Sequence, residues 1–344
     1  MSVTIKDIAN ETGLSVATIS LVLNNKANKI SDKTKKLVME TANRLNYHPN
    51  QLAIGLVKQK TKTLGLIVFD ISNPFFSELA RGVDDEAHAQ GRDIILSSTN
   101  NQADRDICSL NNFCARGVDA IILAMSSDID EDKQLIYQKV ISQLAIPVIL
   151  VDSHDPSFHC SCVQLDNRKG SYIAATHLLS LGHRNIACIT GPSGMHTTQE
   201  RLEGFAWTLK NAGLPFDEKY IFEGNCFHQS GYAAAKKILQ TDATAIFAFN
   251  DMMAFGAFRL LRETGISIPD DMSIVGFDDV YFTELLEVPL TTIRQPAYEI
   301  GREAVRRALV EIGNHNAIKQ NILFEPELIV RKSSAACKGE RQHK

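Results

Sequence analysis

The stretch IKDIANETGLSVATISLVLN, residues 5–24, predicts two short helices joined by a turn that contains glycine. Apolar side chains recur at helical spacing in both halves, and Thr4 is placed to cap the first helix. Gly13 ends that helix, and Ser15 is placed to cap the second. This arrangement is the helix-turn-helix signature, in which the second helix lies in the major groove of DNA. A plain helical hairpin with the same apolar core is the alternative.

The residues after Ser31 predict a third helix, for which Ser31 is a further N-cap. The run Tyr47-His48-Pro49 stops this helix, because a residue before proline disfavours the helical conformation. Three helices within roughly fifty residues can close one small core around the turn, which favours a folded head over an isolated hairpin. The side chains that the helical period turns inward are Leu37, Val38, Ala42 and Leu45.

Length and charge predict more than one domain with different partners. A chain of 344 residues exceeds the size at which one core keeps growing, so two or three domains are expected. Residues 1–62 carry ten Lys and Arg residues against four Asp and Glu residues, a net charge of +6. Because the whole chain carries -4, the remainder carries -10. A basic head on an acidic body fits a polyanionic partner for the head alone, although a solvated charged face would give similar counts.

The seven cysteines form no paired framework, which indicates reduced thiols and a cytoplasmic protein. Neither a signal peptide nor an apolar run of eighteen residues opens the chain, so export and membrane insertion are not expected. No cofactor is expected. His154, His159, Cys160 and Cys162 lie close together, but they lack a CxxC pair and place two donors side by side, so no structural zinc is expected.

Short apolar runs alternate with helical stretches from Thr63 onward. Such runs are typical of parallel strands that are buried on both faces. The alternation predicts a doubly wound α/β fold with enough strands for two sheets. The predicted strands are residues 64–69, 92–98, 119–125, 147–152, 163–166, 185–190, 245–250 and 273–278. The predicted helices are residues 75–90, 105–115, 133–144, 169–181, 199–212, 229–240, 252–264 and 298–312.

Polar side chains follow several of these strands, where ligands bind in open α/β sheets. Carboxylates and amides can each bind neighbouring hydroxyl groups, and Phe75 or Phe76 could pack on the apolar face of a sugar ring. Arg201 supplies a forked donor. Taken singly, a residue of this kind is more often a loop cap or a turn residue than a ligand contact. The polar residues after predicted strands are Asn73, Asp152, Asn250, Asp278 and Gln295.

The run TIKDIANETGLSVATISLVLN, followed by NRLNYHPNQLA, resembles the head of the LacI/GalR family of transcriptional repressors. The similarity continues to about residue 332, with head, hinge and body motifs in that family's order. Within the family, the body resembles ribose-type repressors and, more distantly, periplasmic ribose-binding proteins. The resemblance implies a repressor that binds a palindromic operator in double-stranded DNA as a homodimer. It also implies a switch operated by a small-molecule effector bound between two lobes.

The resemblance also implies a division of the chain. The helix-turn-helix head covers residues 1–48, the hinge helix and linker residues 49–62, and the effector-binding and dimerisation domain residues 63–333. That domain divides into an N-subdomain, 63–164 and 291–323, and a C-subdomain, 165–290 and 324–333, with crossings near Leu165, Leu290 and Phe324. Residues 334–344 have no periodicity and predict a disordered tail.

The resemblance places DNA contacts in the head and in the hinge. Val16, Ala17 and Leu21 occupy groove-facing positions, and because all three are apolar we expect them to read thymine methyl groups and DNA shape. Leu56 is the hinge residue that the family inserts into the minor groove. Gly55 and Val57 depart from the family's usual serine and basic residue, and a plain flexible linker is the alternative. The remaining expected contacts are Thr4, Ser15, Thr18, Ser20 and Asn24.

The body departs from the ribose-binding pattern at two positions. Ser153 replaces an arginine and Cys226 an aromatic residue, so the expected ligand is a pentose or hexose, with or without phosphate, rather than ribose itself. A regulator of the same family that responds to a nucleobase is an alternative, but Cys226 and the lack of an arginine at Met195 speak against it. The pattern's contact positions hold Asn73, Phe75, Phe76, Asp152, Arg201, Asn250, Asp278 and Gln295.

Two further classes of protein fit the sequence poorly. A sugar-transport binding protein would share the body, but it would need a signal peptide and would lack a basic helical head. An enzyme is not expected, because Asp278 and Asp279 are adjacent and their side chains tend to diverge. No GxSxG motif is present, and TGPSG at residues 190–194 lacks the GK[ST] ending of a phosphate loop.

Overall fold

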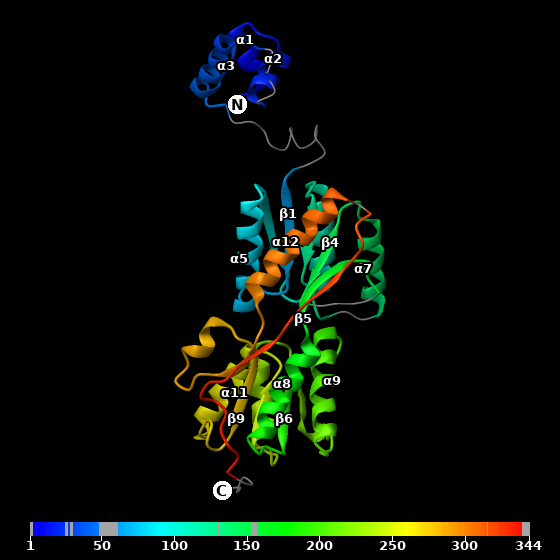
Figure 1. The fold of residues 1–344 in the computed structure, drawn as a ribbon, viewed down its shortest axis with the longest axis vertical. Coiled ribbons are helices and arrows are strands. Elements are labelled where there is room, and N and C mark those ends of the chain that lie inside the picture. Colours follow the sequence, from blue (N-terminus) through cyan, green and yellow to red (C-terminus); the bar gives the residue numbers. More distant parts are fainter. Residues whose placement is uncertain are drawn as a thin grey trace. The chain divides into compact units, whose positions relative to one another are not determined.

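The computed structural model describes residues 3–24, 27, 30–47, 61–128, 131–152, 157–314 and 316–338. The chain forms two compact units, which divide between Thr61 and Lys62 (Figure 1). The described residues of the first unit form three helices, and those of the second form two sheets with their covering helices. The predicted hinge helix, including Leu56, lies outside the described residues and stays a prediction.

The head contains the helices α1 (Ile5–Thr12), α2 (Val16–Leu23) and α3 (Asp32–Arg44). At the start of α1, Thr4 donates from its amide and from its hydroxyl to Asp7 Oδ2, each at 2.7 Å. These bonds form the expected cap, in which an acidic side chain in the first turn reaches back to the N-cap residue.

The predicted end of α1 and the predicted starts of α2 and α3 are also confirmed, whereas α3 ends at Arg44, before the predicted stop at residues 47–49. Gly13 ends α1 with a backbone φ of +67°, which glycine adopts without steric cost. Ser15 Oγ accepts from the amide of Thr18 at 3.2 Å at the start of α2. Ser31 Oγ accepts from the amide of Thr34 at 3.3 Å at the start of α3. Short-range capping therefore fixes where these helices begin and end.

The three helices enclose one apolar core, whose centre is formed by Ile8, Ile19 and Val38. The prediction for α3 was wrong at Leu37, which is 45 % exposed. The inward stripe of α3 starts one residue later, so that Leu37 lies beside the stripe and not in it. The α3 residues that are buried or pack on the core are Val38, Thr41, Ala42 and Leu45.

The first sheet of the second unit, with its helices, forms the N-lobe. The strand order is β11-β5-β4-β3-β1-β2, and every neighbouring pair is parallel. The strands are β1 (Thr63–Val68), β2 (Asp93–Ser98), β3 (Ala120–Leu123), β4 (Val148–Val151), β5 (Ser161–Leu165) and β11 (Asn321–Phe324). The helices are α5 (Pro74–Ala89), α6 (Ala103–Ala115), α7 (Glu131–Gln143) and α12 (Ala297–Gly313).

The second sheet forms the C-lobe, in the order β12-β10-β9-β8-β6-β7. Only β12 is antiparallel to its neighbour among these strands. The strands are β6 (Ile186–Thr190), β7 (Ile221–Glu223), β8 (Ala245–Ala248), β9 (Ser273–Asp278), β10 (Thr291–Arg294) and β12 (Glu327–Ile329). The helices are α8 (Asn167–Ser180), α9 (His196–Asn211), α10 (His228–Ile238), α11 (Asp251–Glu263) and the 3-10 turns η1 (Glu218–Tyr220) and η2 (Tyr281–Glu284).

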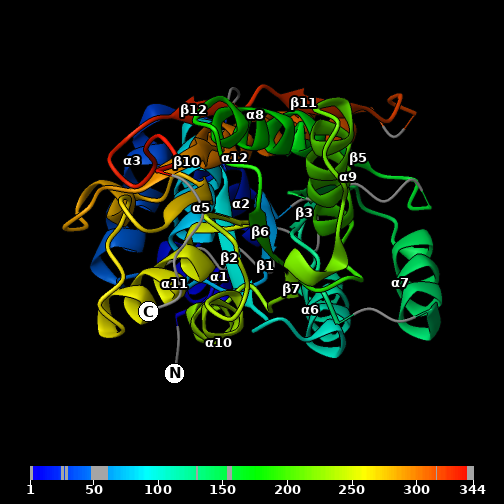
Figure 2. The same ribbon diagram turned by 90° about the horizontal axis from the view of Figure 1, so that it is seen from below.

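Each sheet is covered on both faces, which explains the continuous apolar runs of the sequence. In the N-lobe, Leu64 and Leu66 face the core under α5 and α12, whereas Ile67 faces the core under α6 and α7. In the C-lobe, α8 and α9 cover one face and α10 and α11 the other (Figure 2). Successive side chains of a strand point to opposite faces, so both sets must be apolar.

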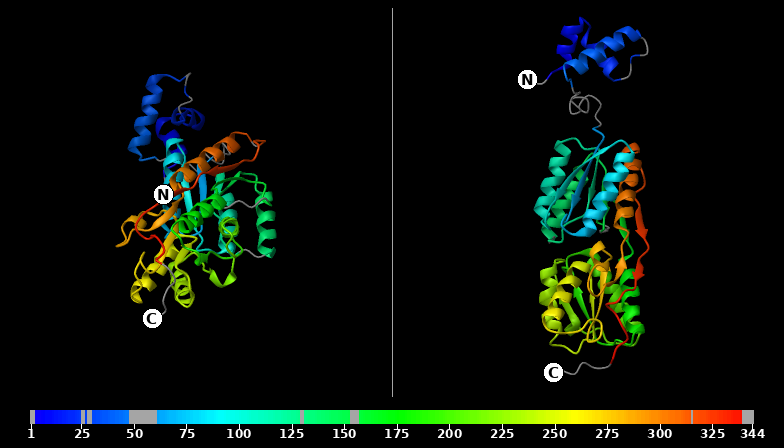
Figure 3. Two further views of the ribbon diagram at one scale, coloured as in Figure 1. Left: turned by 60° about the horizontal axis from the view of Figure 1, so that its bottom comes forward. Right: turned by 90° about the vertical axis from the view of Figure 1, so that its left-hand side faces the viewer.

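The chain passes between the lobes three times (Figure 3). It crosses after β5, between β10 and α12, and between β11 and β12. The predicted crossing near Leu290 was placed too early, because β10 pairs with β9 in the C-lobe. Residues 291–294 therefore belong to the C-lobe and not to the N-subdomain. The crossing lies between Arg294 and Ala297.

All eight predicted strands are present, but four strands were missed. These four are β7, β10, β11 and β12, which have only three or four residues each. Most of their residues are polar or half-exposed, so they carry no continuous apolar run. Three of them pair at the edge of a sheet, where one side of the backbone needs no partner strand.

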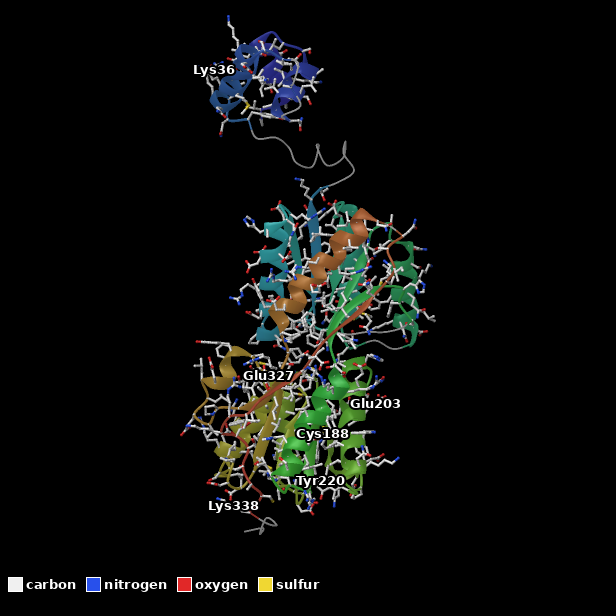
Figure 4. The ribbon with its side chains drawn as sticks, viewed as in Figure 1. Lys36, Cys188, Glu203, Tyr220, Glu327 and Lys338 are labelled. Atoms are coloured by element: carbon white, nitrogen blue, oxygen red, sulfur yellow. The ribbon has the colours of Figure 1, made fainter. Side chains whose placement is uncertain are left out.

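The predicted disordered tail is wrong for residues 334–338. Ser333 is buried and its hydroxyl donates to the Ile274 carbonyl at 2.6 Å. The Cys337 amide donates to the Leu181 carbonyl at 2.8 Å, and Lys338 Nζ lies 2.6 Å from Asp270 Oδ1 (Figure 4). The segment is ordered because the C-lobe satisfies its polar groups, a long-range effect that its own sequence does not carry. Residues 339–344 lie outside the described residues.

Candidate functional site

The outer face of α2 in the head is unusually apolar. Val16 is 42 % exposed and Leu21 is 44 % exposed, while Ile19 and Val22 are buried in the core. Ala17 is exposed between them. The helix thus buries one apolar stripe in the head and leaves a second apolar surface free, which is where the sequence predicted contacts to base edges.

Polar residues surround this surface with their local hydrogen bonds already made. Thr18 Oγ1 lies 2.9 Å from Ser15 Oγ, and Asn24 Nδ2 donates to the Ser20 carbonyl at 2.8 Å. Thr4 is exposed at the start of α1. Exposed hydroxyls at helix N-termini suit contacts to phosphate oxygens, because the backbone amides there also point outward.

The second candidate site is a cavity between the two lobes, here named the interlobe cavity, of about 40 Å³. Nine of the ten predicted effector residues line it, and Ser153 lies outside the described residues. The nine come from seven different elements or strand ends, so only the fold brings them together. They are Asn73, Phe75, Phe76, Asp152, Arg201, Cys226, Asn250, Asp278 and Gln295.

Arg201 is the buried cation of this cavity, at 7 % exposure. Its Nε donates to Asn167 Oδ1 at 2.8 Å, and its guanidinium also donates to the Phe249 carbonyl. The guanidinium carbon lies 3.7 Å from the centroid of the Phe277 ring. Within the described part of the chain, no carboxylate lies within ion-pair distance of Arg201. A buried arginine held by neutral acceptors keeps its charge available to a polar ligand.

Two carboxyl groups share the cavity with Arg201. Asp278 accepts from Gln295 Nε2 at 2.7 Å, and burial raises the pKa of Asp278 to about 7, against the opposing charge of Arg201. Burial likewise raises the pKa of Asp152 to about 6, again opposed by Arg201. Asp152 Oδ1 is buried with no hydrogen-bond partner among the described residues. Both groups therefore change charge near neutral pH and can accept hydrogen bonds from hydroxyls.

Three residues that line the cavity have positive backbone φ angles, which residues other than glycine rarely adopt. The angles are +62° at Asp152, +70° at Cys226 and +123° at Asp278. Such conformations cost roughly 1 to 3 kcal/mol each and persist only where the surroundings enforce them. Their clustering at one cavity supports a functional role for this region more than a role in general folding.

The two asparagines of the cavity act as helix caps. Asn73 Oδ1 accepts from the amide of Phe75 at 3.1 Å, and Asn250 Oδ1 accepts from the amide of Met253 at 2.8 Å. Asn250 Nδ2 also donates to the Cys226 carbonyl at 2.9 Å and so holds that loop. Burial raises the pKa of the Cys226 thiol to about 12, so this thiol stays neutral.

A cluster of phenylalanine rings connects the lobes beside the cavity. The Phe69 and Phe76 rings stack with centroids 5.6 Å apart, and Phe75 meets Phe76 edge-on at 5.1 Å. Phe227 of the C-lobe lies 6.0 Å from Phe69 of the N-lobe, measured between centroids. Apolar contact between these rings favours the approach of the two lobes.

Sequence reasoning missed seven residues that also line the cavity. They too follow strand ends or lie in the first turns of α9 and α11, so the rule that found Asp152 could have found them. Gly191 matters because a Cβ at this position would lie 2.5 Å from Thr198 Oγ1. The seven are Phe69, Gly191, Met195, Thr197, Thr198, Phe249 and Met253.

The described ranges contain neither a cluster of metal-ligating side chains nor a helix that could span a membrane. In those ranges no group of three or more His, Cys, Asp and Glu side chains is arranged to hold a metal ion. No helix in the same ranges is both long enough and apolar enough to cross a membrane.

Comparisons with known proteins match both units. The profile of bacterial regulatory proteins, lacI family, matches residues 4–50, and that of the periplasmic binding protein-like domain matches residues 175–334. The HTH-type transcriptional regulator DegA of Bacillus subtilis (strain 168) is 38 % identical over 336 residues, 97 % of this chain and 99 % of DegA. The chain belongs to the LacI family. As a LacI-family protein it is a DNA-binding transcriptional regulator with a ligand-binding body, and not an enzyme.

Solved structures of LacI-family proteins confirm the predicted fold class. The Lac repressor dimer bound to operator and the anti-inducer ONPF is 26 % identical, with a TM-score of 0.85 over 98 % of this chain and 100 % of that one. A LacI-family regulator from Enterococcus faecium with bound ribose is 33 % identical, with a TM-score of 0.73 over 80 % of this chain and 100 % of that one. The helix-turn-helix head and the two parallel-sheet lobes are thus shared with the family.

Proposed function

We propose that this protein is a repressor that binds a palindromic operator as a homodimer and is switched by a small sugar in the interlobe cavity. The observation that carries the effector part is one buried cation, Arg201, which shares a cavity with the buried Asp278, the half-buried Asp152 and a wall of phenylalanine rings. Polar groups that grip hydroxyls beside an apolar surface are the usual equipment of a sugar site. The relative from Enterococcus faecium, solved with ribose, supports the same class of ligand.

The head supports sequence-specific reading of DNA by shape and by methyl groups. Val16, Ala17 and Leu21 are exposed and apolar, which suits the thymine methyl group in the major groove. One head offers a single short helix, so specific binding needs two half-sites related by a twofold axis. The C-lobe exposes Tyr281, Phe282 and Leu285 on and next to η2, an apolar surface of the kind that a homodimer covers.

The switch follows from the way that the two lobes share the cavity. A sugar that contacts Asn73 and Phe76 on the N-lobe and Arg201 and Asp278 on the C-lobe binds best when the lobes are close together. Such a ligand shifts the population toward the closed form. A change in lobe orientation at a dimer interface alters operator affinity, typically by about 1 to 3 kcal/mol of coupling.

The operator part is tested by selecting duplexes from a random pool with the full-length protein. We expect an inverted repeat. Ala17→Gln should change the preferred sequence, whereas Lys36→Ala, which removes an exposed charge of α3, should weaken all sequences alike. If the head neutralises roughly six to ten phosphates, affinity should fall by about 10³ to 10⁵ between about 50 and 200 mM salt. A selection without an inverted repeat would contradict the proposal.

The effector part is tested by a thermal-shift screen of monosaccharides, sugar phosphates and nucleobases. We expect stabilisation by a sugar, because a ligand that binds only the folded state raises the melting temperature. Hits are then checked for their effect on operator binding by fluorescence anisotropy. Stabilisation by a nucleobase and by no sugar would overturn the effector class while leaving the DNA-binding part intact.

A further inference from the structure

A second cavity, here named the side cavity, adjoins the interlobe cavity and has a volume of about 100 Å³. Phe69, Phe76, Asp152 and Met195 line both cavities, so the two spaces share one wall. The walls of the side cavity come from the N-lobe and from the loop before α9 in the C-lobe. A ligand that extends from one cavity into the other would therefore still contact both lobes.

The shared wall contains an unsatisfied acceptor. Asp152 Oδ1 is buried and lacks a hydrogen-bond partner among the described residues, and its backbone is held at φ +62°. A buried acceptor without a donor is costly, and a donor from a ligand removes that cost. Because Asp152 lines both cavities, its carboxyl group is placed to contact a ligand that occupies both.

The other polar residues of the side cavity are a serine, a glutamine and a histidine. Ser126 and Gln134 come from the N-lobe, and His196 comes from the C-lobe. His196 Nε2 lies 3.7 Å from Glu200 Oε1, so this ring already has an acidic neighbour. Of the described residues that line either cavity, Arg201 alone is a Lys or Arg. A phosphate in the side cavity would meet Asp152 without a permanent cation, which disfavours phosphorylated ligands.

The aromatic residues do not offer a slot for a flat base. Phe69 already packs against Phe76, with 19° between the ring planes, and against Phe227. Phe76 is met edge-on by Phe75. A nucleobase is held by stacking on free ring faces, whereas a sugar ring needs hydrogen-bonding groups around its rim. Polar side chains on both lobes can meet the second requirement, although Ser126 Oγ lies 3.3 Å from Thr99 Oγ1 and Gln134 Nε2 donates to Ser157 Oγ at 3.4 Å, so a ligand would exchange or share these long bonds.

We propose that the two cavities together bind a neutral disaccharide. One ring is held by Arg201 and Asp278 in the interlobe cavity, and the second ring contacts Ser126, Gln134 and His196 in the side cavity. Asp152 accepts from a hydroxyl near the glycosidic bond. The inference rests on one part of the proposed function, namely that the effector is a sugar.

The test is calorimetric titration of the full-length protein with maltose, cellobiose, lactose, sucrose, trehalose and melibiose. Their component monosaccharides, glucose 6-phosphate and adenine are titrated in parallel. We expect at least one disaccharide to bind roughly tenfold or more tighter than either of its components, because the second ring adds hydrogen bonds in the side cavity. That disaccharide should also change operator affinity.

Two matched variants on α7 locate the second ring. Gln134→Leu removes an amide that lines the side cavity, and Gln138→Leu removes an amide one helical turn later that does not line it. We expect Gln134→Leu to cut the advantage of the disaccharide over the monosaccharide about fivefold, with monosaccharide affinity unchanged. Gln138→Leu should change neither affinity.

The possible failures distinguish the two proposals. If no disaccharide binds more tightly than its components, the two-ring site is wrong and the sugar effector stands. The same conclusion follows if Gln134→Leu and Gln138→Leu lower the affinity for the disaccharide equally. If glucose 6-phosphate binds most tightly of the compounds titrated, the proposal that the ligand is a neutral disaccharide is wrong, and the sugar effector stands. Binding of adenine and of no sugar would overturn both proposals.

Discussion

The two lobes contribute different chemistry to the interlobe cavity. The N-lobe provides rings, namely Phe69, Phe75 and Phe76, which are held mainly by contact with one another. The C-lobe provides Arg201 and Asp278, which are held by hydrogen bonds to residues at the crossings between the lobes. The phenylalanine rings can adjust to a substitution by small shifts. When a buried hydrogen-bonded group is replaced, by contrast, its former partners are left without a hydrogen bond. Polar changes on the C-lobe should therefore have larger effects than ring changes on the N-lobe.

The connection to the crossings also suggests how the C-lobe groups act. Asn167, the first residue of α8 after the first crossing, accepts from Arg201, and Gln295 in the second crossing donates to Asp278. A ligand bound by Arg201 and Asp278 would thus be linked to two of the three connections between the lobes. The bond from Arg201 to Asn167 makes one link, and the bond from Gln295 to Asp278 makes the other. The N-lobe rings have no comparable hydrogen-bonded link among the described contacts.

The largest effect is expected for Arg201→Ala. This change removes the only guanidinium that lines the cavity within the described residues and leaves the carboxyl groups of Asp152 and Asp278 without that counter-charge. Effector affinity should fall by roughly 100-fold or more, measured by calorimetry, with operator binding by the ligand-free protein retained. Arg259→Ala on α11, which breaks an exposed ion pair with Glu263, is the control and should change affinity little.

Asp278 should have the next largest effect, with a signature in pH. Asp278→Ala should cost about 1 to 3 kcal/mol of effector binding and abolish the response to the effector. Because the pKa of Asp278 is raised to about 7, this carboxyl group in the folded protein holds a proton, between about pH 4 and pH 7, that the unfolded chain has released. The associated stability is complete below about pH 4 and is lost as the pH rises through about 7.

The melting temperature of the ligand-free protein should therefore fall by a few degrees between about pH 5 and pH 8. Asp278→Asn should make that fall smaller, because the amide does not titrate. Asp152→Asn is the matched variant on the N-lobe. Because the pKa of Asp152 is about 6, the part of the fall in melting temperature that this variant removes should have its midpoint at a lower pH. An unchanged pH profile in both variants would show that these carboxyls do not carry the effect.

A smaller effect is expected for Phe76→Leu on the N-lobe. The change removes the stacking with Phe69 and the edge contact with Phe75 but leaves an apolar side chain in place. Effector affinity should fall about three- to tenfold, by calorimetry, without a change in its pH dependence. If Phe76→Leu costs as much as Arg201→Ala, the division of labour between the lobes is wrong.

The smallest effect is expected for Asn73→Ser. Serine can still cap α5, so the change isolates the amide of Asn73 from its role as a cap. Affinity should fall about two- to threefold, while the melting temperature stays within about 1 °C. A large loss of stability with unchanged affinity would instead assign Asn73 to the helix cap alone.

The sequence predicts best what neighbouring residues determine. The caps at Ser15 and Ser31 and the turn at Gly13 depend on contacts within three or four residues, and all were predicted. Cavity residues such as Asp152 and Asp278 could be predicted because polar groups at the carboxyl ends of parallel strands meet at one edge, whereas Cys226 was predicted only from the family resemblance. Their exact partners could not: the bond from Arg201 to Asn167 joins residues 34 positions apart.

Features that depend on distant pairing escaped prediction. The short strand β10 has too few residues to show which sheet it joins, so its crossing was misplaced. The C-terminal segment is held by His183, whose Nε2 donates to the Ala335 carbonyl at 3.1 Å across 152 residues. No local pattern distinguishes a tail that finds such partners from one that does not.

The three crossings have a consequence for the order of synthesis. The C-lobe strands up to β10 leave the ribosome before α12 and β11, so the C-lobe lacks only the edge strand β12 and the C-terminal segment 333–338 when the N-lobe still lacks a helix and a strand. The N-lobe starts first, but it is completed only after most of the C-lobe has been made. A chain that stops before Ala297 would leave uncovered the face of the N-lobe sheet that α12 packs on. Such premature fragments would expose apolar surface and become substrates for aggregation or proteolysis rather than independently folded lobes.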